Sequence, residues 1–190
     1  MSTTRREQRE RTRQHLLDTT VRCLVEYGYS GTTTHRVQER AQVSRGALLH
    51  HFASRAELFA AAIRYIAGEQ LERFRAAVAG ADSLRHLVTE LRRAMSGPLF
   101  LAGLELWMTA RTDPVLRAAL LPAERRLGRE LRQAYFAVVK RDDAESRTAF
   151  EALLMLLRGL ALTSVLRENP EVADAVVEQW LTRMAPEQSA

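Results

Sequence analysis

Apolar residues recur at helical spacing along nearly the whole chain, and no segment alternates apolar and polar residues as a half-buried strand would. This pattern limits the fold more than any other feature, because side chains three and four positions apart share one face of a helix. We therefore expect an all-α protein of about nine helices. A chain of 190 residues with 46% hydrophobic residues can bury its core without disulfides or a structural metal.

Capping residues, glycines and prolines divide this pattern into separate helices. Gly28 is placed to end the first helix in a left-handed conformation, and the second begins at a cap on Thr33 or Thr34. The arginine-rich first dozen residues are typical of a disordered tail. The expected helices cover about residues 5–27, 34–41, 45–51, 54–78, 83–96, 99–111, 114–140, 144–167 and 170–185.

Positive charge is concentrated in the first third of the chain. Residues 1–55 hold ten arginines and five acidic residues, and this excess of +5 equals the net charge of the whole protein. The asymmetry favours a module that faces a polyanion, joined to a neutral body. A helix face that only meets water is the alternative.

Several function classes find no support in the chain. The basic N-terminus is not followed by an apolar segment, and the longest apolar run ends at Arg158, so we expect neither a secretion signal nor a membrane span. The single cysteine, Cys23, cannot form an internal disulfide, which favours the cytoplasm. No phosphate loop or serine elbow is present, so we expect no catalytic residues, no cofactor and no enzyme activity.

Three helices of about twenty, eight and eight residues, the last two joined by a three-residue turn, have the helix-turn-helix layout. The third helix then enters the major groove of DNA. Arg45 in its first turn can read guanine, and Gly46 lets the backbone come close to the bases. Ala47, Leu48 and Phe52 would face the other helices. The outward positions are Ser44, Arg45, Gly46, Leu49 and His50.

Phosphate contacts should flank this reading helix. Thr34 lies at a helix N-terminus, Arg55 begins the next helix, and His51 can donate a ring N–H. A metal site is a poor alternative, because His50 and His51 are consecutive and lie about 100° apart on a helix, whereas a two-histidine site needs i,i+4 spacing.

Residues 28–63, "GYSGTTTHRVQERAQVSRGALLHHFASRAELFAAAI", resemble the DNA-binding signature of TetR-family transcriptional regulators. The resemblance implies phosphate contacts at Thr34, His51 and Arg55, and base-facing positions at His35, Ser44, Arg45 and Gly46. Two residues depart from the pattern: Leu49 stands where the family usually has a tyrosine, and Gln42 replaces the usual turn glycine. Gln42 must then adopt an uncomfortable conformation, or the turn must differ.

The resemblance also implies an all-α body that dimerises through its last two helices and often binds a small effector. The last two helices carry apolar arcs that would bury across a two-fold axis, although a core within one subunit is the alternative. The expected dimer residues are Phe150, Leu153, Leu157, Leu160, Val177, Trp180 and Leu181.

Large, adaptable side chains could line an effector pocket, although such a stripe is more often plain core. Two charges interrupt apolar runs, and each needs a partner if it is buried; the alternative is that both face water. The candidate pocket residues are Phe74, Met95, Phe100, Leu104, Glu105, Trp107, Met108 and Arg158.

These expectations describe a homodimeric repressor that binds a palindromic operator in double-stranded DNA and is released by a small-molecule effector. Residues 1–55 would be the DNA-binding domain, and residues 56–190 the effector-binding and dimerisation domain. One alternative is a DNA-binding regulator without a small ligand, controlled by another protein or acting as an activator. Another is a small-molecule-binding or catalytic helical protein in which the basic module is incidental.

Overall fold

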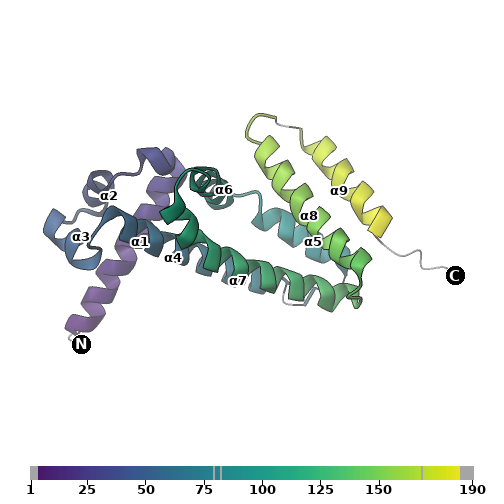
Figure 1. The fold of residues 1–190 in the computed structure, drawn as a ribbon, viewed down its shortest axis with the longest axis horizontal. Coiled ribbons are helices and arrows are strands. Elements are labelled where there is room, and N and C mark those ends of the chain that lie inside the picture. The colour runs from purple at the N-terminus through teal and green to yellow at the C-terminus, as the bar shows by residue number, and fades with distance from the viewer. Residues whose placement is uncertain (1–3, 79, 82, 168, 185–190) are drawn as a thin grey trace. The chain divides into compact units, whose positions relative to one another are not determined.

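The computed structural model describes residues 4–78, 80–81, 83–167 and 169–184. Every regular element in these ranges is an α-helix (Figure 1), which confirms the all-α prediction. Within the same ranges, no helix combines the length and the apolar character needed to cross a bilayer. The helices are α1 (Arg5–Gly31), α2 (Thr34–Ala41), α3 (Arg45–His51), α4 (Arg55–Val78), α5 (Leu84–Ala94), α6 (Pro98–Ala110), α7 (Pro114–Val139), α8 (Ala144–Thr163) and α9 (Pro170–Met184).

The chain divides into two compact units. Unit 1 comprises Met1–Glu69 with Pro98–Arg125, and unit 2 comprises Gln70–Gly97 with Arg126–Ala190. The division falls inside α4 and α7 rather than at residue 55. The functional division predicted at that residue is a separate matter and stays a prediction.

Unit 1 is built around α1, which packs against both α2 and α6. One apolar cluster joins the first half of α1 to α2, α3 and α4, with Leu16, Val37 and Leu48 at most 2% exposed. A second cluster joins the end of α1 to α4, α6 and the start of α7 through Leu24, Phe59 and Leu106. The helix-turn-helix segment therefore shares its supporting helix with α6.

The predicted break at Gly28 is present but does not end the helix. Gly28 has φ 66° and ψ −177°, a positive φ outside the left-handed helical region, and α1 resumes for one turn to Gly31. Thr32 then closes the turn, because its hydroxyl donates to the Gly28 carbonyl oxygen at 2.7 Å. A kink replaces the simple cap that was predicted.

The start of α1 matches the helix expected from about residue 5, whereas the disordered tail expected over the first dozen residues is not seen from Thr4 onward. Thr4 and Glu7 form a reciprocal capping box, in which the Glu7 N–H donates to the Thr4 hydroxyl and the Thr4 N–H donates to the Glu7 carboxylate at 2.9 Å. The helix begins at Arg5 as a consequence.

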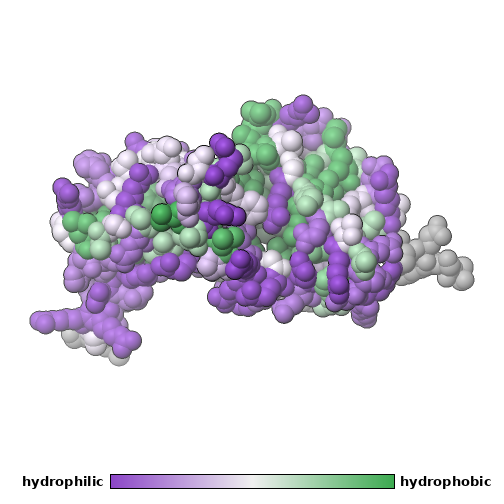
Figure 2. Space-filling view, in the orientation of Figure 1, coloured by the Kyte–Doolittle hydropathy of each residue, from purple (hydrophilic) through white to green (hydrophobic). Residues whose placement is uncertain are grey.

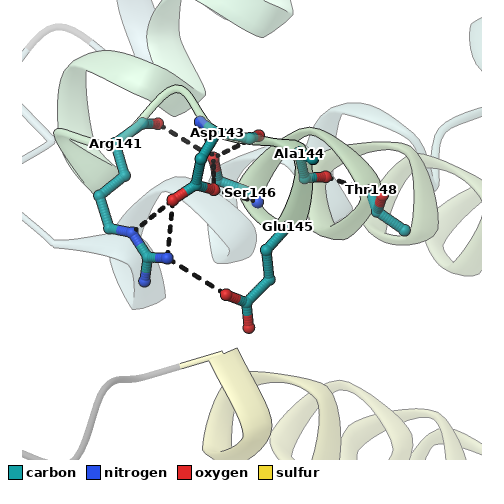
Figure 3. A network of polar contacts seen from close by, with 6 residues as sticks. All are labelled: Arg141, Asp143, Ala144, Glu145, Ser146 and Thr148. Atoms are coloured by element: carbon teal, nitrogen blue, oxygen red, sulfur yellow. Dashed lines mark hydrogen bonds and ion pairs between the residues drawn. The ribbon is translucent and has the colours of Figure 1, made fainter.

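Unit 2 contains α5, α8, α9 and parts of α4 and α7. Figure 3 shows the start of α8, where Asp143 accepts the Ser146 N–H at 2.8 Å and the Arg141 guanidinium at 2.7 Å. The Ser146 backbone bond and then Arg141 hold the pKa of Asp143 well below its usual range. Two helices are shorter than predicted. α8 ends at Thr163, four residues before its predicted end, and α5 ends at Ala94, two residues before its predicted end.

Five of the seven residues predicted for the dimer interface are buried within a single chain. Each is at most 6% exposed, so these side chains form a core. The stated alternative, a core within one subunit, describes these five residues, and their role in a dimer stays a prediction. Both sides of α8 are apolar, so the sequence does not say which side faces inward. Leu160 and Trp180 are half-buried. The five buried residues are Phe150, Leu153, Leu157, Val177 and Leu181.

Candidate nucleic-acid interface

Local capping defines the boundaries of α2 and α3. The Thr33 hydroxyl accepts the Arg36 N–H at 3.1 Å, so Thr33 is the cap of α2 and Thr34 is its first helical residue. The Ser44 hydroxyl accepts the Ala47 N–H at 3.1 Å and starts α3. Two capped helices separated by three residues confirm the predicted helix-turn-helix layout.

Of the two alternatives stated for Gln42, a strained backbone conformation or a different turn, the structure shows the strained conformation. It lies at φ 55° and ψ 40°, in the left-handed region that normally favours glycine. Its N–H donates to the Glu39 carbonyl oxygen at 3.1 Å, and the Val43 N–H donates to Gln38 at 3.1 Å. These two bonds close the end of α2, which offsets the strain at Gln42.

Two long-range hydrogen bonds brace the module against its supporting helices. The His15 ring donates through Nε2 to the Ala41 carbonyl oxygen at 3.1 Å, which ties α1 to the end of α2. The Tyr65 hydroxyl on α4 donates to Asp18 on α1 at 2.7 Å. Burial, and then this bond, raises the pKa of Tyr65 to about 12. The phenol therefore stays protonated near neutral pH.

The face that α3 turns outward matches the prediction. Leu48 and Phe52 are 2% and 1% exposed, while Leu49 is 46% exposed. All five predicted outward positions are exposed. A Cβ added at Gly46 would meet only the Ser44 hydroxyl, at 3.9 Å, so packing within unit 1 does not demand a glycine there. The exposed positions are Ser44, Arg45, Gly46, Leu49 and His50.

His51 stands at the inner edge of this face. Its ring is half-buried, and its Nδ1 makes no hydrogen bond with any described residue. Burial lowers the pKa of His51, and the nearby His50, Arg9 and Arg13 lower it further. The imidazole is neutral at pH 7 as a result, and a neutral ring retains one N–H donor.

Arg55 occupies the exposed start of α4. Its Nη2 donates to the Tyr29 carbonyl oxygen at 3.3 Å, and its guanidinium lies 5.1 Å from the Phe59 ring centroid. The Ser54 hydroxyl caps the helix by accepting the Glu57 N–H at 3.1 Å. The Glu57 carboxylate accepts the N–H of Ala53 rather than that of Ser54. A guanidinium carries five N–H donors, so Arg55 retains donors for a phosphate.

His35 lies on the exposed side of α2. Its Nδ1 is 3.2 Å from the Glu39 carboxylate, in an i,i+4 pair whose side chains are 74% and 65% exposed. Thr34 beside it is half-buried. The roles predicted for both residues toward DNA stay predictions.

Some arginines of the basic module serve the fold. Arg40 on α2 forms an ion pair with Glu26 on α1, and the Arg36 guanidinium lies 4.3 Å from the Tyr27 ring centroid. Their charge is therefore partly committed to joining α1 and α2. The count of ten arginines overstates the charge available to a polyanion.

The end of α1 is tied to α6 by Glu105. This residue is exposed, and its carboxylate accepts the Tyr29 N–H at 2.7 Å. The Tyr29 hydroxyl also donates to Asp113 at 3.5 Å. Glu105 was predicted as a pocket residue, and the alternative was that it faces water. It faces water and bonds to the helix that supports α2.

The other pocket candidates fall in different units. Phe74, Met95 and Arg158 belong to unit 2, and the remaining candidates to unit 1. A cavity of about 430 Å³ between α5, α8 and α9 includes Met95, and one of about 260 Å³ in unit 1 includes Trp107. The Trp107 indole donates to Glu124 at 2.8 Å, and Met108 is 67% exposed. Phe74 is buried, Arg158 is half-buried, and so are Phe100 and Leu104.

Metal binding has no geometric basis in the described ranges. Nowhere in them do three His, Cys, Asp or Glu side chains gather closely enough to hold an ion.

Comparison with known proteins identifies the family. Residues 16–62 match the model described as "Bacterial regulatory proteins, tetR family". The chain is also 32% identical over 171 residues to the HTH-type transcriptional repressor Rv1474c of Mycobacterium tuberculosis, and that alignment covers 87% of this chain and 89% of the relative. The chain belongs to the TetR family.

The chain is similar to two further proteins. The repressor AcnR of Corynebacterium glutamicum is 36% identical over 110 residues, a match that spans 56% of this chain and only 54% of AcnR. A crystal structure of the multidrug binding protein EbrR, complexed with imidazole, has a TM-score of 0.64 and 26% identity over 94% of this chain and 97% of that one.

The TetR-family match begins at Leu16, whereas α1 begins at Arg5. The prediction of DNA contacts from sequence used only residues 34–55 and left the arginines of α1 out. The signal that could have found them is the spacing of Arg5, Arg9 and Arg13, because residues four apart share one face of a helix.

Proposed function

We propose that the chain is a repressor that binds a palindromic operator as a homodimer and is released by a small-molecule effector. The observation that carries this proposal is the outward face of α3, which presents Arg45, Gly46 and His50 to the exterior while Leu48 and Phe52 hold the helix to its support. The names of the relatives Rv1474c and AcnR support repression.

The proposed DNA contacts are of two kinds, contacts to bases and contacts to phosphates. Arg45 and Gly46, with Ser44, His50 and His35, would face the bases. Thr34, His51 and Arg55 would hold phosphates on either side. In this proposal residues 1–55 read DNA, and residues 56–190 bind the effector and the second subunit.

The proposed function is tested by titrating DNA from directly upstream of the gene with the purified protein, followed by fluorescence anisotropy. We expect saturable binding to a short palindrome, with two subunits per site, in the presence of nonspecific competitor. Binding that competitor DNA abolishes would contradict a sequence-specific regulator.

The effector site that we propose lies in unit 2. The crystallised relative EbrR is named as a multidrug binding protein and was solved with imidazole. The cavity of about 430 Å³ in unit 2 lies within the usual range of small-molecule sites. A compound that binds here should release the operator, since a ligand shifts an equilibrium by its different affinity for two states. A regulator that no small molecule releases would instead be controlled by another protein.

The dimer surface that we propose is the exposed side of α8. Ala152, Met155, Gly159 and Leu162 are all exposed and follow a three-four-three spacing, which aligns them on one face. Leu166 in the following turn is 90% exposed. Figure 2 shows hydrophobic surface gathered over α8 and α9. An apolar helix face of this kind buries well against its own copy across a two-fold axis.

Leu162→Glu is expected to give a folded monomer. Leu162 is 59% exposed in one chain, so the substitution leaves the core intact and places a charge where two copies would meet. Analytical ultracentrifugation should show the smaller species, and affinity for the palindrome should fall more than affinity for a single half-site. Val115→Glu on α7, at 69% exposure, is the matched control and should stay dimeric. Dimers in both variants would place the interface elsewhere.

Arg55→Ala is expected to weaken binding to every DNA sequence alike. Removing one phosphate contact per subunit removes two from the dimer–operator complex, so the negative slope of log K against log salt should become shallower by about 1.8. The substitution also removes the bond to the Tyr29 carbonyl oxygen, so thermal unfolding must be recorded in parallel. Arg64→Ala, an exposed arginine farther along α4, is the control. A changed sequence preference with an unchanged salt slope would contradict this role.

A further inference from the structure

The first turns of α1 extend beyond the core of unit 1. Residues 4–11 are all exposed, and the first fully buried side chain is Leu16. Figure 1 shows this part of α1 running out past α3. Apolar packing does not hold these turns in place, yet the Thr4 and Glu7 capping box keeps them helical.

Arginines form a row along this extension. Arg5, Arg9 and Arg13 are each four residues apart and therefore lie on one side of α1. Glu7 and Glu10 interrupt the sequence, but Arg6 and Arg11 add further positive charge. The extension is basic overall.

The row lies beside the C-terminal end of α3. The Arg13 guanidinium lies 5.3 Å from the ring centroid of Phe52, the C-cap residue that follows α3. Arg9 and Arg13 are both close enough to His51 to lower its pKa, which Glu10 opposes. A helix face placed in this way continues the phosphate-facing surface that we propose at His51.

We propose that Arg5, Arg9 and Arg13 form a second DNA-binding surface, which holds the phosphate backbone just outside the half-site that α3 reads. Guanidinium groups bind phosphate oxygens through paired N–H donors. The row rises about 12 Å along α1, since each residue adds about 1.5 Å. Phosphates on one DNA strand are about 3.4 Å apart along the axis, so each arginine can meet a different one.

This inference rests on the proposed function, because it names a further part of the same DNA-binding surface. Phosphate contacts made by the row should increase affinity for DNA without favouring any base sequence. The row should therefore contribute equally to operator and to random-sequence DNA, and it should make operator binding depend on base pairs that flank the half-site.

The test combines two variants of the full chain with two kinds of duplex. One variant carries Arg5→Gln, Arg9→Gln and Arg13→Gln; the other keeps Arg13, and with it the Phe52 contact, and carries only the first two changes. The control replaces three exposed arginines of α7 by glutamine and so has the same net charge as the triple variant. These arginines are Arg125, Arg126 and Arg129. Salt-dependent anisotropy is recorded on a random-sequence duplex, and on the upstream DNA with long or trimmed flanks.

We expect the salt slope to become shallower by about 0.9 for each lost phosphate contact, counted over both subunits of the dimer, with the slope of the control unchanged. The preference for the operator over random DNA should persist, and trimming the flanks should weaken the wild type but not the triple variant. The inference would be overturned if both variants had the same salt slope as the control, or if trimming the flanks did not weaken binding by the wild type. Operator binding itself, and with it the proposed function, would be unaffected by either result. A wild type that binds no DNA would overturn the proposed function as well.

Discussion

Arg45→Ala is expected to remove most of the preference for the operator over random DNA while leaving nonspecific binding nearly intact. Arg45 is exposed in the first turn of α3, beside the open Gly46, where its guanidinium can meet guanine O6 and N7 together. A bidentate contact of this kind contributes about 1–3 kcal/mol of discrimination, which is about five- to 150-fold in relative affinity. The ratio of dissociation constants for operator and competitor, measured at one salt concentration, gives the effect.

Arg45→Lys is the informative companion to that variant. Lysine keeps the positive charge but lacks the planar fork, so it should preserve nonspecific affinity and still lose much of the discrimination. If Arg45→Ala weakened operator and random DNA by the same factor, Arg45 would be a phosphate contact and the proposed assignment of base reading to α3 would be wrong.

Gly28→Ala is expected to destabilise the protein and to loosen the connection between α1 and α6. Gly28 lies at φ 66° and ψ −177°, in a region that is essentially restricted to glycine and costs other residues about 1–3 kcal/mol. A Cβ there would lie 2.6 Å from Oε1 of Glu105, the atom that accepts the Tyr29 N–H. The carboxylate would have to move, and that hydrogen bond would weaken.

Thermal and urea unfolding measure this effect, with an expected drop in Tm of about 2–4 °C for each kcal/mol at this chain length. Gly128→Ala on α7 is the control, because an added Cβ meets nothing there and helical alanine is favoured. The double variant Gly28→Ala with Glu105→Ala removes the close contact but not the backbone strain. Wild-type stability in Gly28→Ala would contradict the strain at this position.

The local features of the fold were readable from the sequence because each depends on residues within about one helical turn. The start of α3 at Arg45, the start of α7 at Pro114 and the outward face of α3 all came from spacing alone. The same reasoning offered Thr33 or Thr34 for the cap of α2, and the structure selects Thr33. The match to the family model is equally local, since it covers residues 16–62.

The features that the sequence did not determine involve residues that are far apart in the sequence and in contact in the fold. Both sides of α8 carry apolar residues, and only packing against α7 and α9 shows that Phe150 faces inward while Met155 faces outward. Glu105 meets Tyr29 across 76 residues, and Arg13 meets Phe52 across 39. Helical periodicity defines which residues share a face, but it does not say what that face touches. The fold class and the reading face of α3 thus follow from local spacing, whereas the exposed face of α8 and the placement of the α1 arginines depend on tertiary packing.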